Sequence, residues 1–294
     1  MPFIVGARKR IVVAIDWTDF AGDDQSTVAI RLITNHGRAT PLVWKSVRKS
    51  ELEGQRNAIE DEVLMMLRDS LPTGVRVTVL ADRGFGSIDF FAQFEEYLKW
   101  DYIVRFRGGI GIYDESGTSR TAASLIPEGG GVADVRSALL TKRGYKTRVV
   151  CTRQPRMKDD WCLATSMKGA ASSVIALYGR RFTIEESFRD EKDHRFGFGL
   201  SDATIGTPER RDRLLFVTML AMIFLTMIGA AGEQLRLDRG LNVNTVTHKR
   251  SLSLLRQARE YVAGAFHRLW ADLRAVFYKL LQEHAECVVV HAII

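Results

Sequence analysis

The stretch RIVVAIDW, from Arg10 to Trp17, is a continuous apolar run that ends in an aspartate, Asp16. A run of this kind is typical of a strand buried on both faces of a sheet. A second run of the same form, VRVTVLAD, ends in Asp82. If the two strands are parallel neighbours, their carboxylates emerge at the same edge of the sheet. The two runs therefore predict a buried sheet with an acidic edge.

The segments around these runs predict the order three strands, helix, strand, helix, strand. The β-type residues of STVAIRLITN and GRATPLVWKSV lie on either side of the turn NHG, which predicts an antiparallel pair. Residues 55–70 have helical spacing, IDFFAQFEEYLKW predicts a second helix, and DYIVRF predicts a strand. This alternation of strands and helices indicates the α/β class.

The pattern loosens between residues 107 and 160, where glycine-rich turns, short strands and basic loops are expected. Regular structure returns with WCLATS, which begins at Trp161, and the rest of the chain is mostly helical in pattern. The sequence therefore divides into three stretches, residues 1–106, 107–160 and 161–294.

The composition narrows the classes of partner and compartment. A formal net charge of +7 and a pI near 9.4 fit a nucleic-acid partner. Three cysteines without a CxxC pair indicate a reducing compartment, so we expect a cytoplasmic, nucleoid-associated protein.

The uncharged run from Leu214 to Ala231 is long enough for a membrane span. A helix buried behind a sheet has the same composition, and we favour that interpretation and expect no membrane partner.

The segment YGRRFTIEESFRDEK, from Tyr178 to Lys192, mixes an aromatic side chain with cations and carboxylates. On one helix at about 100° per residue, four polar side chains share a face about 60° wide: Tyr178, Arg181, Glu185 and Lys192. An apolar stripe beside that face places Glu185 at the edge of a core, whereas Glu186 points away and should be solvated. A surface helix stabilised by ion pairs has the same pattern.

Asp16, Asp82 and Glu185 together form a candidate metal site. Three neighbouring carboxylates repel one another, and divalent cations remove that penalty. Mg²⁺ and Mn²⁺ prefer oxygen ligands, and a pair of them about 4 Å apart can promote in-line displacement at phosphorus. Taken singly, each aspartate is also compatible with an ordinary turn at the end of a strand.

The other polar side chains of the predicted helix suit a nucleic-acid backbone. Arg181 and Lys192 would hold phosphates, and Tyr178 would form a hydrogen bond to the backbone or stack on a base. The mixture on this helix therefore predicts metal-assisted chemistry on DNA.

These segments together resemble a known family. YGRRFTIEESFRDEK matches the Tyr-x2-Arg-x3-Glu-x6-Lys motif of DDE transposases of the IS-four family at all four positions. DWTDF, ADRGF and WCLATS are similar to the segments that accompany the motif. FGFGL, PERRDRLL and NTVTHKRSLS are similar to the branch of that family that includes the IS-ten element.

The resemblance implies a ribonuclease H-like catalytic core, interrupted at residues 107–160 by a β-rich insertion and followed by a helical C-terminal region. It implies that the metal-binding triad consists of Asp16, Asp82 and Glu185. It also implies DNA contacts near the cleaved end from three further residues: Tyr178, Arg181 and Lys192. Trp161 lies where hairpin-forming relatives have a tryptophan that receives a flipped base, although a core tryptophan is equally compatible with the sequence.

The implied reaction is cut-and-paste transposition by a two-metal site that uses Mg²⁺ or Mn²⁺. It comprises hydrolysis at the element's end, formation and opening of a DNA hairpin, and strand transfer into target DNA. The implied partners are transposon ends, target DNA and a second copy of the chain in the paired-end complex.

Only fifteen residues precede Asp16, where family members usually carry a helical DNA-binding region, so we expect little preference for terminal repeats.

Three alternatives to an active transposase remain open from the sequence. A truncated or inactive transposase fragment, which retains only nuclease or non-specific DNA-binding activity, is the nearest alternative. A non-catalytic DNA-binding protein and a membrane-associated protein are the others.

Overall fold

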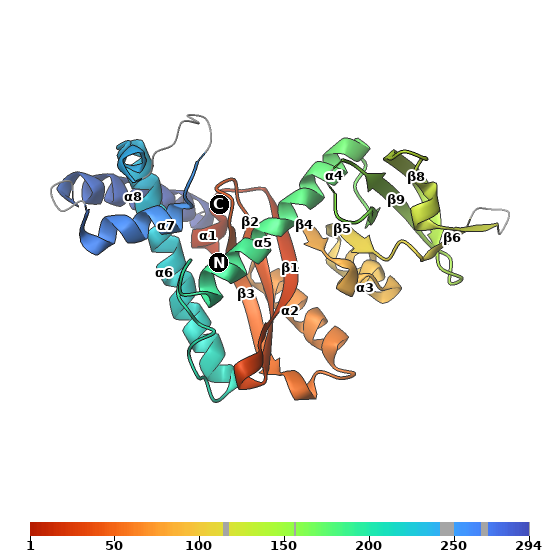
Figure 1. Ribbon diagram of the computed structural model, residues 1–294, viewed down its shortest axis with the longest axis horizontal. Helices are drawn as coiled ribbons and strands as arrows, with labels where there is room; N and C mark the ends of the chain where they lie inside the picture. The colour runs from red at the N-terminus through yellow and green to blue at the C-terminus, as the bar shows by residue number, and fades with distance from the viewer. Residues whose placement is uncertain (114–117, 156, 242–249, 266–269, 294) are drawn as a thin grey trace. The chain divides into compact units, whose positions relative to one another are not determined.

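The computed structural model describes residues 1–113, 118–155, 157–241, 250–265 and 270–293 (Figure 1). The chain forms two compact units, and each is built from segments that are distant in sequence. The first unit contains Met1–Lys9, Trp17–Thr73 and Thr183–Ile294, and the second contains Arg10–Asp16 and Gly74–Phe182. The segment 242–249, which covers much of the motif NTVTHKRSLS, lies outside the described residues.

The second unit contains the two apolar runs that end in aspartate. Strand β1 (Arg10–Phe20) runs parallel to β4 (Arg76–Ala81), and β4 runs parallel to β5 (Asp101–Phe106). Apart from the partly buried Val12 and Trp17, the apolar side chains of β1 and β4 are almost completely buried, which confirms the prediction of core strands. Helix α3 (Ile88–Gln93) begins at Ser87, whose hydroxyl accepts a hydrogen bond from the amide of Phe90 at 3.2 Å.

The rest of the second unit extends this sheet with antiparallel strands. Their bounds are β6 (Gly111–Tyr113), β7 (Ser119–Thr121), β8 (Gly131–Leu140), β9 (Tyr145–Arg153) and β10 (Trp161–Thr165). The order within the unit is β1-β4-β5-β10-β9-β8-β6-β7. Helix α4 (Ala171–Gly179) follows β10. The stretch in which the sequence pattern loosens thus contributes strands to one continuous sheet, and β8 and β9 are longer than the short strands that the sequence predicts.

The first unit contains an antiparallel hairpin, as the sequence predicts. Strand β2 (Gln25–Ile33) pairs with β3 (Ala39–Arg48), with a register shift at Ile30/Arg31. Helix α2 (Arg56–Ser70) buries Val63, Leu64 and Leu67 and lies where the helical spacing predicts it. Observed in chain order, β1, β2, β3, α2, β4, α3 and β5 confirm the predicted alternation.

Helices form the remainder of the first unit (Figure 1). Their bounds are α1 (Pro2–Val5), α5 (Thr183–Lys192), α6 (Pro208–Gln234), α7 (Leu254–Glu260) and α8 (Trp270–Ile293). Helix α6 packs against β3, α7 and α8. Thr207 caps its first turn by accepting a hydrogen bond from the amide of Arg210 at 3.4 Å, and Pro208 occupies the first helical position, where proline is favoured.

Helix α6 contains the uncharged run from Leu214 to Ala231. Among the described residues, it is the one helix that is long and apolar enough to cross a membrane, although core helices of soluble proteins also pass that test. Only 33% of its apolar window is buried, and large apolar side chains are exposed at Phe216, Val217, Leu220 and Phe224. The prediction of a helix buried behind a sheet thus holds for one side of α6 only, the side that packs against β3 and the neighbouring helices.

Two glycines allow α7 and the segment after it to approach α6 closely. A Cβ atom added at Gly229 would lie 2.2 Å from the carbonyl oxygen of Leu254. A Cβ atom added at Gly232 would lie 2.2 Å from the ring of Tyr261, whose side chain is buried. Such distances require a backbone or ring displacement, so these positions exclude any larger residue in the present packing.

We expect Gly229→Ala to lower the free energy of unfolding by about 1–3 kcal/mol, the range for overpacked sites, although alanine is the better helix former. Gly206→Ala is the matched control, because nothing lies within 4 Å of a Cβ atom at that position. Urea unfolding of both variants measures the difference. Equal stabilities would contradict the close approach of α7 to α6.

Candidate active site

Asp16 and Asp82 lie at neighbouring positions on paired parallel strands. The ladder between β1 and β4 ends at the pair Ile15 and Ala81, and each aspartate is the next residue. Neighbouring strands are about 4.8 Å apart, so the two aspartates are adjacent at one edge of the sheet. The conditional prediction from the sequence, that these strands are parallel neighbours, is confirmed. The strand β1 nevertheless continues to Phe20, so Asp16 marks the end of the pairing with β4 and not the end of the strand.

The side chain of Asp82 also organises the turn that follows β4. Its Oδ1 accepts a hydrogen bond from the amide of Gly84 at 2.7 Å and caps the 3-10 turn Arg83–Phe85. Asp82 therefore has the role of a turn residue at a strand end, which the sequence analysis left open as an alternative. It fixes the carboxylate at the strand end, because the side chain is held by the backbone that it terminates.

The side chain of Asp16 is held by an ion pair. Nη1 of Arg181 lies 3.1 Å from its Oδ2, and the side chains are only 6% and 18% exposed, respectively. The guanidinium carbon of Arg181 also lies 5.1 Å from the ring centroid of Phe182, within the range of a cation–π contact. Arg181 therefore supplies positive charge to the acidic edge of the sheet, where the sequence predicts a phosphate contact.

The segment from Tyr178 to Lys192 is not one regular helix, and this corrects the sequence prediction. Helix α4 ends at Gly179, a 3-10 turn covers Arg180–Phe182, and α5 begins at Thr183. Gly179 and the aromatic and β-branched residues after it are weak helix formers, which favours a break at this place. A projection at 100° per residue is therefore not valid across the break, and a shared face of the four motif side chains stays a prediction.

Tyr178 and Trp161 form the centre of an aromatic cluster in the second unit. Their ring centroids are 4.9 Å apart in an edge-to-face arrangement, and the ring of Phe182 lies 5.9 Å from that of Trp161. Tyr178 is 1% exposed, and burial raises the pKa of its hydroxyl to about 12. Trp161 is half-buried and Phe182 is 40% exposed. The cluster thus has a buried tyrosine and an accessible aromatic edge.

Glu185 lies on an exposed side of α5 in the first unit, although the sequence places it at the edge of a core. Its neighbour Glu186 is half-exposed and pairs with Arg189 and Arg38. Across the part of the chain that the structure describes, no group of three His, Cys, Asp or Glu side chains could hold a metal ion. The structure thus brings Asp16 and Asp82 together, and the convergence of Glu185 with them stays a prediction.

Lys192 ends α5 and is held in the first unit. Its ammonium group donates to the carbonyl oxygen of Asp19 at 2.7 Å and to the hydroxyl of Thr18 at 3.3 Å. It also lies 5.3 Å from the ring centroid of Phe20. Burial lowers the pKa of Lys192, and the carboxylate of Asp19 opposes that shift. Lys192 therefore fastens α5 to the last residues of β1.

Other charged residues of α5 anchor the helix, and the sequence prediction missed them. Glu191 pairs with Arg31 at 2.6 Å, with both side chains at most 3% exposed. Asp190 pairs with Arg38 at 2.5 Å. The sequence signal that could have found them is the helical period of α5, because both lie on the side of the helix that carries the buried Ser187, away from Glu185.

The family described as "Transposase DDE domain" matches residues 7–223 of the chain. This match covers most of the sequence, and the chain belongs to the DDE transposase family.

Comparison with solved structures gives weak similarities only. The Argonaute protein of A. aeolicus is 11% identical, with 68% of this chain and 26% of that chain covered and a TM-score of 0.28. The Argonaute protein of Marinitoga piezophila, in complex with guide RNA and target DNA, is 11% identical, with 69% and 28% covered and a TM-score of 0.26. The chain thus spans about a quarter of the length of these structures, and TM-scores this low do not show a common fold. No curated protein matches the chain.

Proposed function

We propose that the chain is a cut-and-paste DNA transposase of the IS-four family, in the branch that includes the IS-ten element. The observation that carries the proposal is the adjacent position of Asp16 and Asp82 at the end of the β1–β4 ladder, in a chain of the DDE transposase family. Residues 1–106 and 161–294 would form the two parts of a ribonuclease H-like core, and residues 107–160 the β-rich insertion.

The residues at the acidic edge fit divalent cations. Two carboxylates on adjacent strands supply the hard oxygen ligands that Mg²⁺ and Mn²⁺ prefer. We infer that Asp16, Asp82 and Glu185 would hold two such ions. When bound, the ions would promote attack on phosphorus and departure of the leaving oxygen.

The chain's other residues would position the DNA strand. Arg181 balances the charge of Asp16 in the absence of DNA and could exchange this partner for a phosphate, because guanidinium binds both groups in the same geometry. Lys192 and Tyr178 would support the strand from α5 and from the aromatic cluster. The reaction would proceed from hydrolysis at the element's end through a hairpin to strand transfer.

The partners of this proposal are the transposon ends, the target DNA and a second copy of the chain in the paired-end complex. The net charge of +7 supports attraction to phosphates. We place the protein in the cytoplasm, associated with the nucleoid. No observation favours the alternative of an inactive fragment over an active transposase.

Incubation with a plasmid that carries the element's terminal repeats tests the proposal. The proposal requires Mg²⁺-dependent nicks and hairpins at the repeats and none in EDTA, a result that would overturn the expectation from the sequence of little preference for these repeats. Nicks scattered over the plasmid would instead indicate a nuclease that retains no transposition, and binding without any nick would indicate a DNA-binding fragment.

Trp161 provides a separate prediction for the hairpin step. Formation of a hairpin requires a sharp bend, and an aromatic platform offsets the cost of unstacking a base. We expect Trp161→Ala to leave first-strand nicking within about threefold and to reduce hairpin formation by about tenfold or more, since stacking on an aromatic contributes about 1–3 kcal/mol. Gel analysis of end-labelled DNA measures both products.

Trp161→Phe is the matched control, because it keeps an aromatic ring beside Tyr178 and should restore much of the hairpin yield. A fall in the thermal unfolding midpoint together with equal loss of both products would show that Trp161 serves the core alone.

A further inference from the structure

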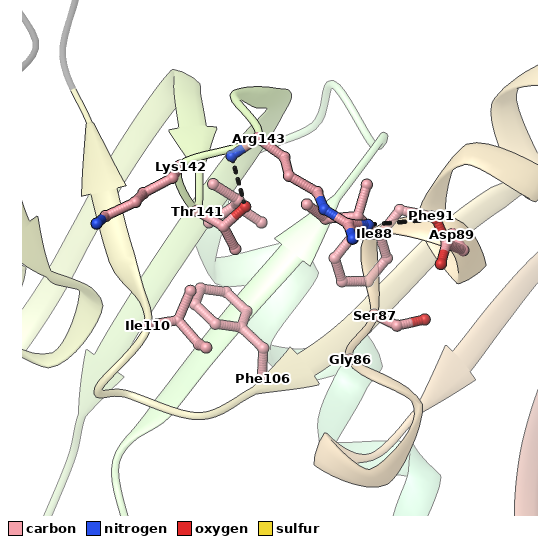
Figure 2. Close-up of a pocket in the computed structure, with 11 residues that line it drawn as sticks. Gly86, Ser87, Ile88, Asp89, Phe91, Phe106, Ile110, Thr141, Lys142 and Arg143 are labelled. Carbon is pink, nitrogen blue, oxygen red and sulfur yellow. Dashed lines mark hydrogen bonds and ion pairs between the residues drawn. The ribbon is translucent and has the colours of Figure 1, made fainter. Parts of the chain in front are cut away.

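A cavity of about 460 Å³ lies in the second unit, on the side of the sheet that carries α3 (Figure 2). Three segments surround it: the residues that follow the Asp82 turn, the end of β5 with the loop after it, and the turn between β8 and β9. Its volume is within the range of about 300–1,000 Å³ for small-ligand sites. It combines an apolar hollow with two cations, Lys142 and Arg143, at its rim.

The cavity is separate from the aromatic cluster of Trp161. Phe106, which lines it, pairs with Cys162 across the ladder between β5 and β10. Side chains of consecutive strand residues point to opposite faces, so Trp161 projects from the other face of the sheet. The cavity nevertheless adjoins the acidic edge, because Gly86 and Ser87 in its wall follow Asp82 closely in the chain.

The wall of the cavity is apolar. Ile88, Phe91, Phe106 and Ile110 line it, and Figure 2 shows Phe106 and Ile110 on one side of the hollow and Ile88 and Phe91 on another. Phe91 and Phe106 are at most 3% exposed, so both rings are fixed by the core behind them. The accessible part of the wall is formed by Ile88 and Ile110, which are only partly buried, so a flat aromatic or heteroaromatic group could enter against these two side chains.

The rim of the cavity is basic. Lys142 and Arg143 extend in different directions from the turn between β8 and β9 (Figure 2). Arg143 lies 4.0 Å from Asp89, but the side chains are 76% and 83% exposed, and such a pair is weak. A phosphate would compete readily with this partner.

The turn that carries the two cations has an unusual backbone. Thr141 has φ of +59° and Gly144 has φ of +70°. A β-branched residue is rare in the left-handed region, and such conformations persist where the surrounding structure holds them. Here the amide of Thr141 donates to the carbonyl oxygen of Gly111 at 2.9 Å, and the hydroxyl of Thr141 accepts from the amide of Arg143 at 3.2 Å. The cations are thus held above the hollow by a fixed turn.

We infer that this cavity binds one unpaired nucleotide of DNA, with the base against Ile88 and Ile110 and the phosphate at Lys142 or Arg143. The inference rests on the proposed function, which brings DNA to the neighbouring Asp82. An apolar hollow accepts a base only when that base has left the helical stack, so paired DNA would contact the rim alone. An uncharged apolar ligand would make no use of the two cations.

A binding experiment without metal tests the inference. Two duplexes of equal length are compared in EDTA by fluorescence anisotropy, one fully paired and one with a single bulged nucleotide. We expect tighter binding of the bulged duplex by about tenfold, which is the order of the gain from burying part of one base against apolar side chains. A third duplex with a bulged abasic residue should bind like the paired one. A preference that survives removal of the base would overturn the inference.

Variants assign the preference to this cavity. Ile110→Trp should fill the hollow and remove the preference, while binding of the paired duplex stays within about twofold, because the rim cations remain. Ile88→Ser, which removes an apolar wall at the start of α3, should have the same effect if the larger substitution unfolds the protein. Arg143→Ala should weaken binding of the bulged duplex more than the matched control Arg136→Ala, an exposed cation on β8. A preference unchanged in Ile110→Trp and in Ile88→Ser would overturn the inference.

The two proposals fail separately. If the wild-type protein cleaves the terminal repeats in Mg²⁺ but does not prefer the bulged duplex, the nucleotide site alone is refuted. Absence of cleavage by the wild-type protein would refute the proposed function, whatever the anisotropy shows.

Discussion

Asp82→Asn is expected to abolish strand cleavage, with a rate at least about a thousandfold below that of the wild type, because metal-ion catalysis contributes several kcal/mol. Asparagine has nearly the same shape, and its side-chain oxygen can still accept the hydrogen bond from the amide of Gly84. The turn after β4 should therefore persist. What is lost is the negative charge beside Asp16, which a divalent cation requires.

Single-turnover cleavage of labelled terminal-repeat DNA measures this effect, and anisotropy measures binding of the same DNA. Binding should stay within about threefold, since the substitution leaves every phosphate-binding cation in place. Asp69→Asn is the matched control, because that aspartate is exposed on α2 and pairs only locally with Arg68. A variant that cleaves at a tenth of the wild-type rate or faster would contradict the role of Asp82.

Arg211→Met is expected to lower the free energy of unfolding by about 3–5 kcal/mol, the range for breaking a buried ion pair. Arg211 has no exposed surface, and its guanidinium donates to Asp23, to Oε1 of Gln25 at 3.1 Å and to the carbonyl oxygen of Leu200 at 3.2 Å. The ring centroid of Phe20 lies 3.9 Å from its guanidinium carbon. Methionine would leave the largely buried carboxylate of Asp23 without its cationic partner, although the amide of Ile205 would still donate to it.

Urea unfolding measures this loss, with Arg210→Met as the matched control on the exposed side of α6. The double variant Asp23→Asn with Arg211→Met should be less destabilised than the sum of the two single variants, because the second change removes the uncompensated charge. A loss below about 1 kcal/mol, the usual value for exposed pairs, would show that Arg211 does not hold this part of the fold.

The sequence predicts the strands best where burial dominates. The apolar residues before Asp16 and Asp82 are mostly buried, as expected for core strands, and the parallel pairing of these strands places the two aspartates together. The resemblance in the motif segments leads to the family that the match over residues 7–223 shows. These parts depend on local pattern and are therefore available from one sequence.

The remaining differences have tertiary causes. The break at Arg180–Phe182 replaces regular helical hydrogen bonds with a 3-10 turn, a choice that periodicity does not record. Arg211 belongs to PERRDRLL, a segment whose three arginines look alike in sequence, and only the fold shows which one is buried. The exposed side of α6 could not be predicted either, because the apolar residues of this helix show almost no helical periodicity.

We propose that the carboxylates at the end of the β1–β4 ladder form a divalent-cation site. Titration of the purified protein with Mn²⁺, followed by electron paramagnetic resonance of the free ion, tests it most directly. We expect the wild type to bind Mn²⁺. We expect binding to be at least about tenfold weaker, the lower end for a perturbed metal site, in each of three variants: Asp16→Asn, Asp82→Asn and Glu185→Gln. Glu186→Gln, the neighbour on α5, should bind like the wild type. Unchanged Mn²⁺ binding in both aspartate variants would contradict the claim.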